Sequence, residues 1–223
     1  MPMISRLASD ERGFTIAELL VSTVVSVLIL GGAVSLTSQV QNGYRRQMEE
    51  VAAEQEGRYA LDWLSRLIRA AGNNPYSIAT GNCPVANTAF SGLIINSAQP
   101  STIRIQTDSN PPDRLLGGDT GNCTQPNEDV TVSYDANTRS ITFLDNNLGG
   151  GASVRTEPVI MALQFIYRDG SHALLNPADP GFTAAQVMYV ETRITVQPRA
   201  IGNQSGTLTR VLSQEVRIKG RNF

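Results

Sequence analysis

The chain has 223 residues, of which 41% are hydrophobic and 17% are charged, a composition typical of a protein that folds around a core. Eighteen Lys and Arg residues against twenty Asp and Glu residues give a formal net charge of −2. The chain therefore lacks the basic surplus that neutralises a nucleic-acid backbone, and we expect no direct nucleic-acid binding. Lys219 is the only lysine and His172 the only histidine, so we expect neither a multi-histidine metal site nor a lysine-bound cofactor.

One stretch near the N-terminus is far more apolar than the rest of the chain. The 23 residues from Phe14 to Leu36 contain Glu18 as their only ionisable side chain. A helix needs about 20 predominantly apolar residues to span a bilayer, so this stretch predicts a transmembrane helix. A carboxylate at such a depth is costly unless it has a partner. The position of Glu18 therefore requires an explanation.

Two ordinary explanations of this segment leave Glu18 unexplained. In a secretory signal peptide, the charged region would end at Arg12 and cleavage would follow the small residues 31–33. The apolar run is longer than the about 7–15 residues usual for such a peptide, and it carries an acid near its start. An uncleaved membrane anchor is the second explanation, but it gives the carboxylate no partner.

The residues around this carboxylate resemble a known processing signal. The run from Arg12 to Leu20, RGFTIAELL, is similar to the prepilin signal of type IV pilins and type II secretion pseudopilins. The resemblance implies that a membrane-embedded prepilin peptidase cleaves after Gly13 and that the same enzyme N-methylates Phe14. Residues 1–13 would then be a leader peptide, and its removal leaves 210 of the 223 residues.

The same resemblance supplies a partner for Glu18. Cleavage creates an α-amino cation at Phe14, and such a cation can pair with a carboxylate in a medium of low dielectric. In the family this acid pairs with the N-terminal amine of an adjacent subunit and sets its axial register, and we expect that role for Glu18. The resemblance also implies that the N-terminus faces the cytoplasm and that the C-terminal domain lies outside it.

Helical signals continue beyond the membrane segment. Opposite charges four residues apart suit a solvated helix face, and an apolar stripe with helical spacing follows them. The pairs are Arg45/Glu49, Arg46/Glu50, Glu54/Arg58 and Asp62/Arg66, and the stripe is Ala60, Trp63, Leu64, Leu67, Ile68 and Ala71. We predict one helix from Phe14 to Ala71, ended by a left-handed Gly72. Residues 14–36 form its transmembrane or filament-core part, and residues 37–72 form an amphipathic stalk.

Residues 73–223 have the alternating pattern of β-strands. The predicted strands Val130–Tyr134 and Ser140–Leu144 flank turn residues 135–138 and predict a hairpin. The other predicted strands are Leu93–Asn96, Thr102–Thr107, Ile160–Arg168, Val187–Gln197 and Val211–Lys219. We expect an α+β fold in which the long N-terminal helix packs on a mostly antiparallel β domain, as in type IV pilins.

Three later segments resemble one class within the family. Segments Arg58–Gly72, Leu163–Gly170 and Val216–Phe223 look like those of PilW-type minor pilins, and the J-type pseudopilin of type II secretion has a similar layout. The resemblance implies a non-enzymatic, low-abundance subunit that helps to prime pilus assembly. Its implied partners are the prepilin peptidase, the major and other minor pilins, and the inner-membrane assembly platform.

The resemblance also implies where the chain lies in the cell. Before assembly it would be a single-pass inner-membrane protein with a periplasmic C-terminal domain, and after assembly it would be part of a fibre at the cell surface. The alternative from another functional class is a membrane-anchored periplasmic binding module or enzyme. That alternative leaves Glu18 without a role.

Two cysteines lie in loop-rich sequence of the domain that we expect outside the cytoplasm. Cys83 and Cys123 are separated by 39 residues, and a disulfide between them is the natural prediction for such a compartment. Two free thiols or a metal-binding pair are weaker alternatives because no histidine accompanies either cysteine.

The remaining polar residues give no catalytic or metal site. Asp169, Ser171 and His172 are close neighbours in one loop, whereas catalytic triads are assembled from separate elements. A second loop contains the acids Asp108, Asp113 and Asp119. Their spacing differs from that of a calcium-binding loop, and we expect them to be solvated turn residues.

Overall fold

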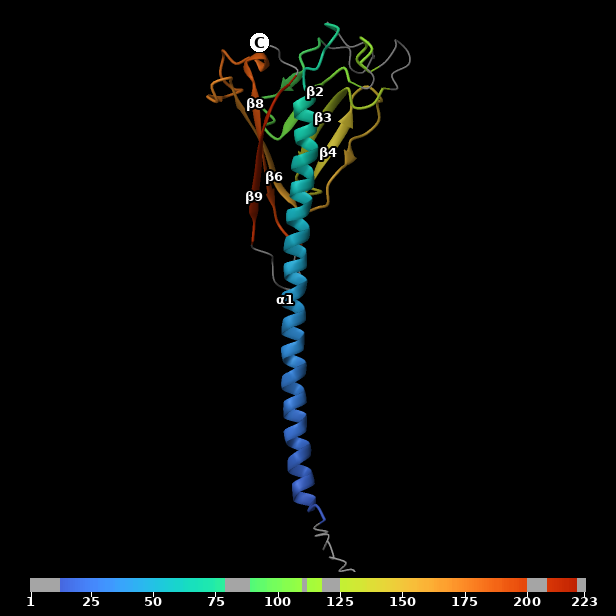
Figure 1. Ribbon diagram of the computed structural model, residues 1–223, viewed down its shortest axis with the longest axis vertical. Helices are drawn as coiled ribbons and strands as arrows, with labels where there is room; N and C mark the ends of the chain where they lie inside the picture. Colours follow the sequence, from blue (N-terminus) through green and yellow to red (C-terminus); the bar gives the residue numbers. More distant parts are fainter. Residues whose placement is uncertain (1–12, 79–88, 110–111, 118–124, 200–207, 220–223) are drawn as a thin grey trace, which may run out of the picture. The chain divides into compact units, whose positions relative to one another are not determined.

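The computed structural model describes residues 13–78, 89–109, 112–117, 125–199 and 208–219 (Figure 1). The chain divides into two compact units, one ending at Gln47 and one beginning at Met48. The described residues form one long apolar N-terminal helix and two antiparallel β-sheets. The predicted α+β class is confirmed at this level.

The helix α1 runs from Ile16 to Ala70, 55 residues without a break, and it passes through Gly31 and Gly32. It begins two residues later than predicted because Thr15 is its N-terminal cap, and the Thr15 carbonyl accepts the first helical hydrogen bond from the Leu19 N–H at 3.1 Å. It ends at Ala70, one residue before the predicted Ala71, and Gly72 is left-handed as predicted, with a φ of +74°. The Gly72 N–H donates to the Gln106 carbonyl at 2.9 Å, which ties the end of α1 to a strand.

The first sheet contains five strands that follow one another in chain order. They are β1 (Leu93–Ile95), β2 (Thr102–Gln106), β3 (Asp129–Asp135), β4 (Ser140–Asp145) and β5 (Ser153–Val154). The predicted hairpin is β3–β4, in which Asp135 pairs with Ser140. The Asp135 carboxylate accepts hydrogen bonds from the Asn137 N–H and the Thr138 hydroxyl, both at 2.9 Å, so the turn is closed by its own first side chain.

The second sheet has four antiparallel strands in the order β7–β6–β8–β9. They are β6 (Ile160–Arg168), β7 (Leu174–Leu175), β8 (Tyr189–Val196) and β9 (Arg210–Arg217), and a short 3-10 helix, η1 (Ala184–Gln186), precedes β8. The sequence predicts the three long strands with small boundary errors. It misses β5 and β7, which have two residues each and therefore no alternation to detect.

Within the second unit, α1 and both sheets share one apolar core. The helix contributes Ala60, Leu64 and Ile68 of the predicted stripe as fully buried residues, while Trp63 and Leu67 pack against the core at its margin. The Trp63 and Phe143 rings lie 5.8 Å apart and tilted at 55°, a geometry that aromatic pairs favour. The predicted packing of an amphipathic helix segment on antiparallel sheets is therefore present in this unit.

A buried ion pair joins neighbouring strands of the first sheet. Asp129 is fully buried, and its two carboxylate oxygens lie 2.6 and 2.7 Å from Nε and Nη2 of Arg104. The Gln106 and Asn146 side-chain amides donate to the same carboxylate at 3.0 and 2.9 Å. With several donors around it, this buried charge is compensated.

Candidate functional site

The candidate site is the start of α1, where Thr15 and Glu18 form a capping box. The Thr15 hydroxyl and the Thr15 N–H both donate to Glu18 Oε2 at 3.0 Å. In return, the Glu18 N–H points to the Thr15 hydroxyl oxygen at 3.3 Å. The two residues thereby satisfy backbone donors that a helix N-terminus otherwise leaves unpaired. We did not predict this role of Thr15, although the spacing Thr-x-x-Glu is its known sequence signal.

Gly13 and Phe14 lie just outside the helix and are both exposed, with Phe14 83% accessible. A Cβ atom placed on Gly13 would meet no described atom within 4 Å. The described fold therefore contains no steric reason for a glycine at this position. The peptide bond between these two residues lies in an accessible segment before the first helical turn.

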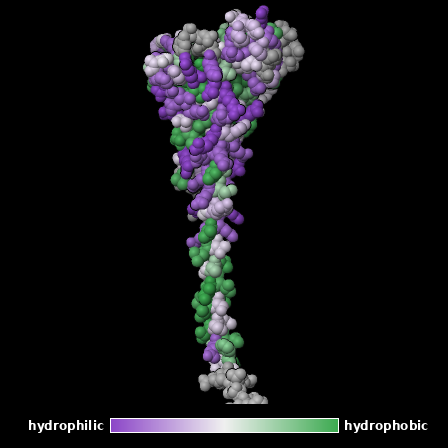
Figure 2. All heavy atoms as spheres, in the orientation of Figure 1, coloured by the Kyte–Doolittle hydropathy of each residue, from purple (hydrophilic) through white to green (hydrophobic). Residues whose placement is uncertain are grey.

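The first unit exposes the apolar side chains of α1 on every side. Accessible fractions include 87% for Ile16, 70% for Leu28 and 66% for Val34, and Figure 2 shows the green, hydrophobic spheres along this part of the helix. Soluble proteins rarely leave a continuous apolar surface of this extent uncovered. By length and composition α1 can cross a membrane, a property that it shares with signal sequences. The segment is a candidate membrane-spanning helix.

Several hydroxyl groups in this part of α1 bond to the helix backbone. Ser22, Ser26 and Thr37 donate to the carbonyls of Leu19, Ser22 and Ala33 at 2.7–2.9 Å. These hydroxyls are therefore satisfied without water, which is what an apolar environment demands. The Glu18 carboxylate differs from them because it carries charge and lies at the end of the segment.

The geometry at the helix start sets what the Glu18 carboxylate can do. Its bonds to Thr15 turn it toward the N-terminal end of α1. In a chain cleaved after Gly13, the new α-amine would lie on Phe14, the residue immediately before Thr15. A cationic amine and the carboxylate would then lie at the same end of the helix, and each could be paired within a chain or between chains.

The predicted disulfide lies outside the described residues, because Cys83 and Cys123 belong to segments 79–88 and 118–124. Asp119 lies outside them as well. These predictions remain as the sequence states them.

The loop that contains the only histidine is held by its own side chains. The Ser171 hydroxyl donates to Asp169 Oδ1 at 2.7 Å. The His172 ring instead stacks on Tyr189, with centroids 4.0 Å apart, and its Nδ1 lies 3.3 Å from Glu215 Oε1. The serine and histidine side chains thus have different partners. The Asp169 pKa is lowered, chiefly by the hydrogen bond from Ser171.

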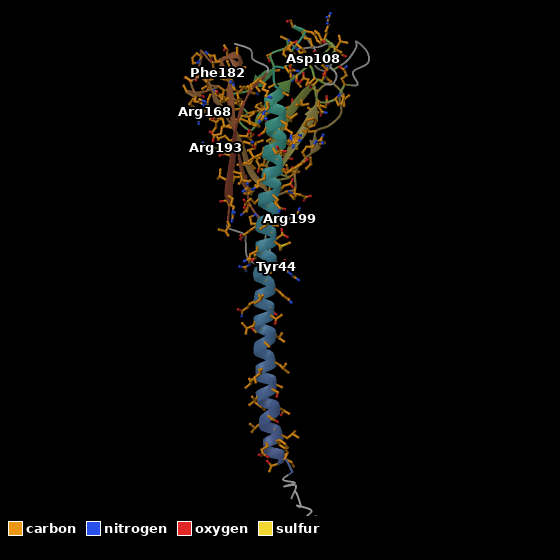
Figure 3. The ribbon with its side chains drawn as sticks, in the orientation of Figure 1. Tyr44, Asp108, Arg168, Phe182, Arg193 and Arg199 are labelled. Atoms are coloured by element: carbon orange, nitrogen blue, oxygen red, sulfur yellow. The ribbon has the colours of Figure 1, made fainter. Side chains whose placement is uncertain are left out.

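Asp108 corrects the expectation of solvated loop acids. This residue, labelled in Figure 3, is fully buried. Its Oδ1 accepts the Asp113 N–H at 3.1 Å. The Asp108 N–H donates to the carbonyl of Asn73, three residues after the end of α1, and the Asn73 side-chain amide donates to the Asp108 carbonyl, both at 2.8 Å. The loop packs against the end of the helix, which spacing alone does not reveal. Among the described residues, no group of three or more Asp, Glu, His or Cys side chains is placed to hold a metal ion.

Comparison of the sequence with protein-family models and with curated proteins finds no match.

Proposed function

We propose that this chain is a minor pilin of a type IV pilus, of the PilW type. The observation that carries the proposal is the setting of Glu18. It is the only ionisable side chain in a 23-residue apolar run, it lies in the first turn of α1, and it follows the exposed Gly13–Phe14 segment. The prepilin resemblance gives this carboxylate a partner, the amine that cleavage creates.

The exposed apolar surface of α1 supports an assembling protein. Its side chains need a bilayer before assembly and other subunits after it, because water solvates such a surface poorly. Gly31, Gly32 and Gly43 also lie in this part of the helix, and a Cβ atom on any of them would meet no described atom within 4 Å. Each glycine costs a helix about 1 kcal/mol relative to Ala. A close helix–helix contact with another subunit is a reason to retain them.

Gly13 supports processing at this position. Since the described fold leaves room for a side chain there, a requirement for glycine must come from another molecule. A peptidase that approaches the backbone closely imposes that requirement. Cleavage after Gly13 and N-methylation of Phe14 by a prepilin peptidase follow in the proposal.

In the proposed pathway, the precursor is anchored in the inner membrane with its C-terminal domain in the periplasm. Glu18 then pairs with the N-terminal amine of a neighbouring subunit, so that α1 enters the filament at a fixed axial register. The partners are the major and other minor pilins and the inner-membrane assembly platform. The β domain stays exposed on the fibre, and the chain itself catalyses no reaction.

Substitution of Glu18 tests the assembly role. A Glu18→Ala chain should remain in the membrane, because the apolar run is unchanged, and it should be lost from sheared surface fibres. Ser26→Ala is the matched control, since it removes a polar group from the same segment whose only described bond is to the Ser22 carbonyl. Equal amounts of wild-type and Glu18→Ala chain in the fibres would contradict the proposal.

A deletion strain separates the alternatives. Loss of surface fibres supports a pilus subunit, whereas loss of exported enzymes with fibres intact identifies the J-type pseudopilin of a type II secretion system. A strain that keeps both, in cells that express the chain, supports a membrane-anchored periplasmic binding module or enzyme instead.

A further inference from the structure

A pocket of about 250 Å³, here called the inter-sheet pocket, lies between the edge strands of the two sheets. The edge strand of the first sheet is β1 and that of the second is β7, and both line the pocket together with β6 and the loop after β1. Its apolar lining consists of Ile95, Pro100, Phe165, Leu174, Leu175 and Pro177. All of its lining residues belong to the second unit, whereas Glu18 belongs to the first.

Tyr167 of β6 contributes a buried hydroxyl to the lining of this pocket. The residue is only 3% accessible, and its hydroxyl has no hydrogen-bond partner in the described part of the chain. Its ring lies against that of Phe182, labelled in Figure 3, with centroids 6.5 Å apart. Burial raises the pKa of the Tyr167 phenol, so the hydroxyl keeps its proton and can donate. Because buried hydroxyls are nearly always paired, this one calls for a partner from outside the chain.

Hydrogen bonds within the chain hold the walls of the pocket in place. The Phe165 N–H donates to the Pro100 carbonyl at 3.4 Å, which joins β6 to the loop after β1. On the rim, Asn96 and Asn176 each accept, through Oδ1, the N–H of the residue two positions later, at 3.0 and 3.1 Å. Both rim loops are thereby closed by an asparagine side chain. The pocket is therefore preformed, as most small-molecule sites are.

The volume and the lining of the pocket limit the kind of ligand. A cavity of about 150 Å³ with apolar walls can bind benzene, so about 250 Å³ can hold an aromatic ring with a substituent. Phe165 and Tyr167 are aromatic side chains, and aromatic rings pair favourably with one another. The described lining residues include no charged side chain. A charged ligand would therefore lose its hydration without gaining an ionic partner.

We propose that the inter-sheet pocket binds a small, uncharged aromatic molecule whose ring carries one oxygen, as in the phenols. The ring packs against the apolar side chains of β1, β6 and β7. The Tyr167 hydroxyl donates its hydrogen bond to the ligand oxygen. This binding does not depend on the proposed pilin function, because no residue of the pocket takes part in processing or in the pairing of Glu18.

A titration of the full-length chain in detergent micelles tests the proposal. The chain carries ¹³C-labelled leucine methyl groups, the probe is 4-methylphenol, and the signals are followed by NMR. The methyl signals of Leu174 and Leu175 should shift saturably, with a Kd on the order of 1 mM or lower. Leu148 is the internal control, because it is 49% accessible and does not line the pocket. No saturable shift, or an equal shift at Leu148, would overturn the proposal.

Two matched substitutions test whether the ligand occupies this pocket. Ala178 and Ala173 are both exposed in the same region of the chain, but only Ala178 lines the pocket. Ala178→Trp places an indole at the rim and should weaken the binding of 4-methylphenol at least about tenfold. Ala173→Trp should leave the affinity within about twofold of wild type. Equal affinities in the two variants would show that the ligand binds elsewhere, against the proposal.

Tyr167→Phe tests the hydrogen bond, since it removes the hydroxyl and keeps the ring in the core. Toluene is the matched ligand without an oxygen. The ratio of the affinities for 4-methylphenol and toluene should fall about fivefold in this variant. Partition of each ligand into detergent is the same for both chains and cancels from the comparison. An unchanged ratio would contradict the proposed hydrogen bond and with it the proposal.

Further outcomes separate this inference from its neighbours. If the peptide N-acetyl-Gly-Tyr-Gly-amide shifts the two leucine signals and free 4-methylphenol does not, the pocket docks a protein side chain and the proposal is wrong. The mass of the N-terminus in the same preparation tests the pilin function independently. Binding by a chain that is unprocessed at Phe14 supports the pocket and contradicts the pilin function, whereas a processed chain without binding overturns the pocket alone.

Discussion

The Thr15 hydroxyl donates a hydrogen bond to Glu18 Oε2 at 3.0 Å and receives one from the Glu18 N–H at 3.3 Å. This reciprocal pair closes the N-terminal end of α1 with the one carboxylate in the apolar segment. The same carboxylate is thus a structural cap in the single chain and, in the proposed filament, the partner of an amine. Thr15 orients Glu18 for either role.

Removal of the cap should loosen the helix start. Thr15→Ala deletes both bonds made by the hydroxyl and should destabilise the first turn by about 1 kcal/mol. Amide exchange at Ala17 to Leu19, measured by NMR in detergent micelles, should accelerate about fivefold. Thr23→Ala is the control, because the Thr23 hydroxyl bonds only to the Leu20 carbonyl, at 2.8 Å, among the described contacts. Equal exchange in both variants would contradict the cap.

The close approach of Gly92 to Gly72 predicts a large effect of one methyl group. Gly92 has a φ of +73°, and a Cβ atom there would lie 2.5 Å from the Gly72 Cα. Gly92→Ala should therefore destabilise the second unit by about 3 kcal/mol, combining backbone strain with overpacking. Chemical denaturation in detergent, followed by the fluorescence of Trp63, measures the loss. Gly150 has a φ of +94°, and a Cβ atom there would meet no described atom within 4 Å. Gly150→Ala should therefore reduce the free energy of unfolding by only about 1 kcal/mol. If the two variants are equally stable, the contact is absent.

The Arg104–Asp129 pair predicts that neutralising a buried carboxylate destabilises the fold much more than neutralising a surface one. Asp129→Asn removes the fully buried carboxylate that accepts hydrogen bonds from Arg104, Gln106 and Asn146, and it should reduce the free energy of unfolding by about 1.5–3 kcal/mol. Asp62→Asn breaks an ion pair that is 78% and 61% exposed and should cost less than about 1 kcal/mol. Urea titrations of both variants check this difference, and similar midpoints would refute it.

Glu191 predicts a pH dependence of stability. Hydrogen bonds from Arg193, at 2.7 Å, and then Arg168, at 3.1 Å, lower the pKa of its carboxyl below the ordinary 4.5. A lowered pKa stabilises the folded state above 4.5, and this stabilisation is lost as the pH falls through the folded-state pKa. Glu191→Gln should therefore be less stable than wild type at neutral pH, and the difference should shrink below pH 4.5. A difference that stays constant down to pH 3 would contradict the assignment.

Periodicity explains how much of this fold is predictable from sequence. The apolar run, the stripe from Ala60 to Ala71 and the hairpin turn after Asp135 are local patterns, and the structure contains the helix, the packed face and the hairpin that they predict. The spacing of apolar residues identifies which face of a helix or strand is buried, but it does not give the distance to the atoms that pack against that face. The close approach of Gly92 to Gly72 and the burial of Asp108 therefore could not be predicted from the sequence. The Arg104–Asp129 pair could not be predicted either, because its members are 25 residues apart.

The candidate site, unlike the fold, was identified from a resemblance and not from periodicity. Gly13, Phe14 and Glu18 were identified through a resemblance of a few consecutive residues, and their roles depend on molecules outside this chain. The structure of a single chain shows the surroundings of these residues. The Gly13–Phe14 segment is exposed, Glu18 belongs to a capping box, and the apolar helix surface is uncovered. The capping partner Thr15 was predictable from its spacing to Glu18 alone.

The most direct test of the central claim is the mass of the mature N-terminus. Mass spectrometry of the chain purified from its host membrane should find a first residue of N-methyl-Phe14, with the 13 preceding residues absent. That result requires cleavage after Gly13 and leaves Glu18 as the fifth residue beside a new amine. A chain that begins at Met1, or near Val34 after cleavage at the small residues 31–33, would contradict the pilin proposal.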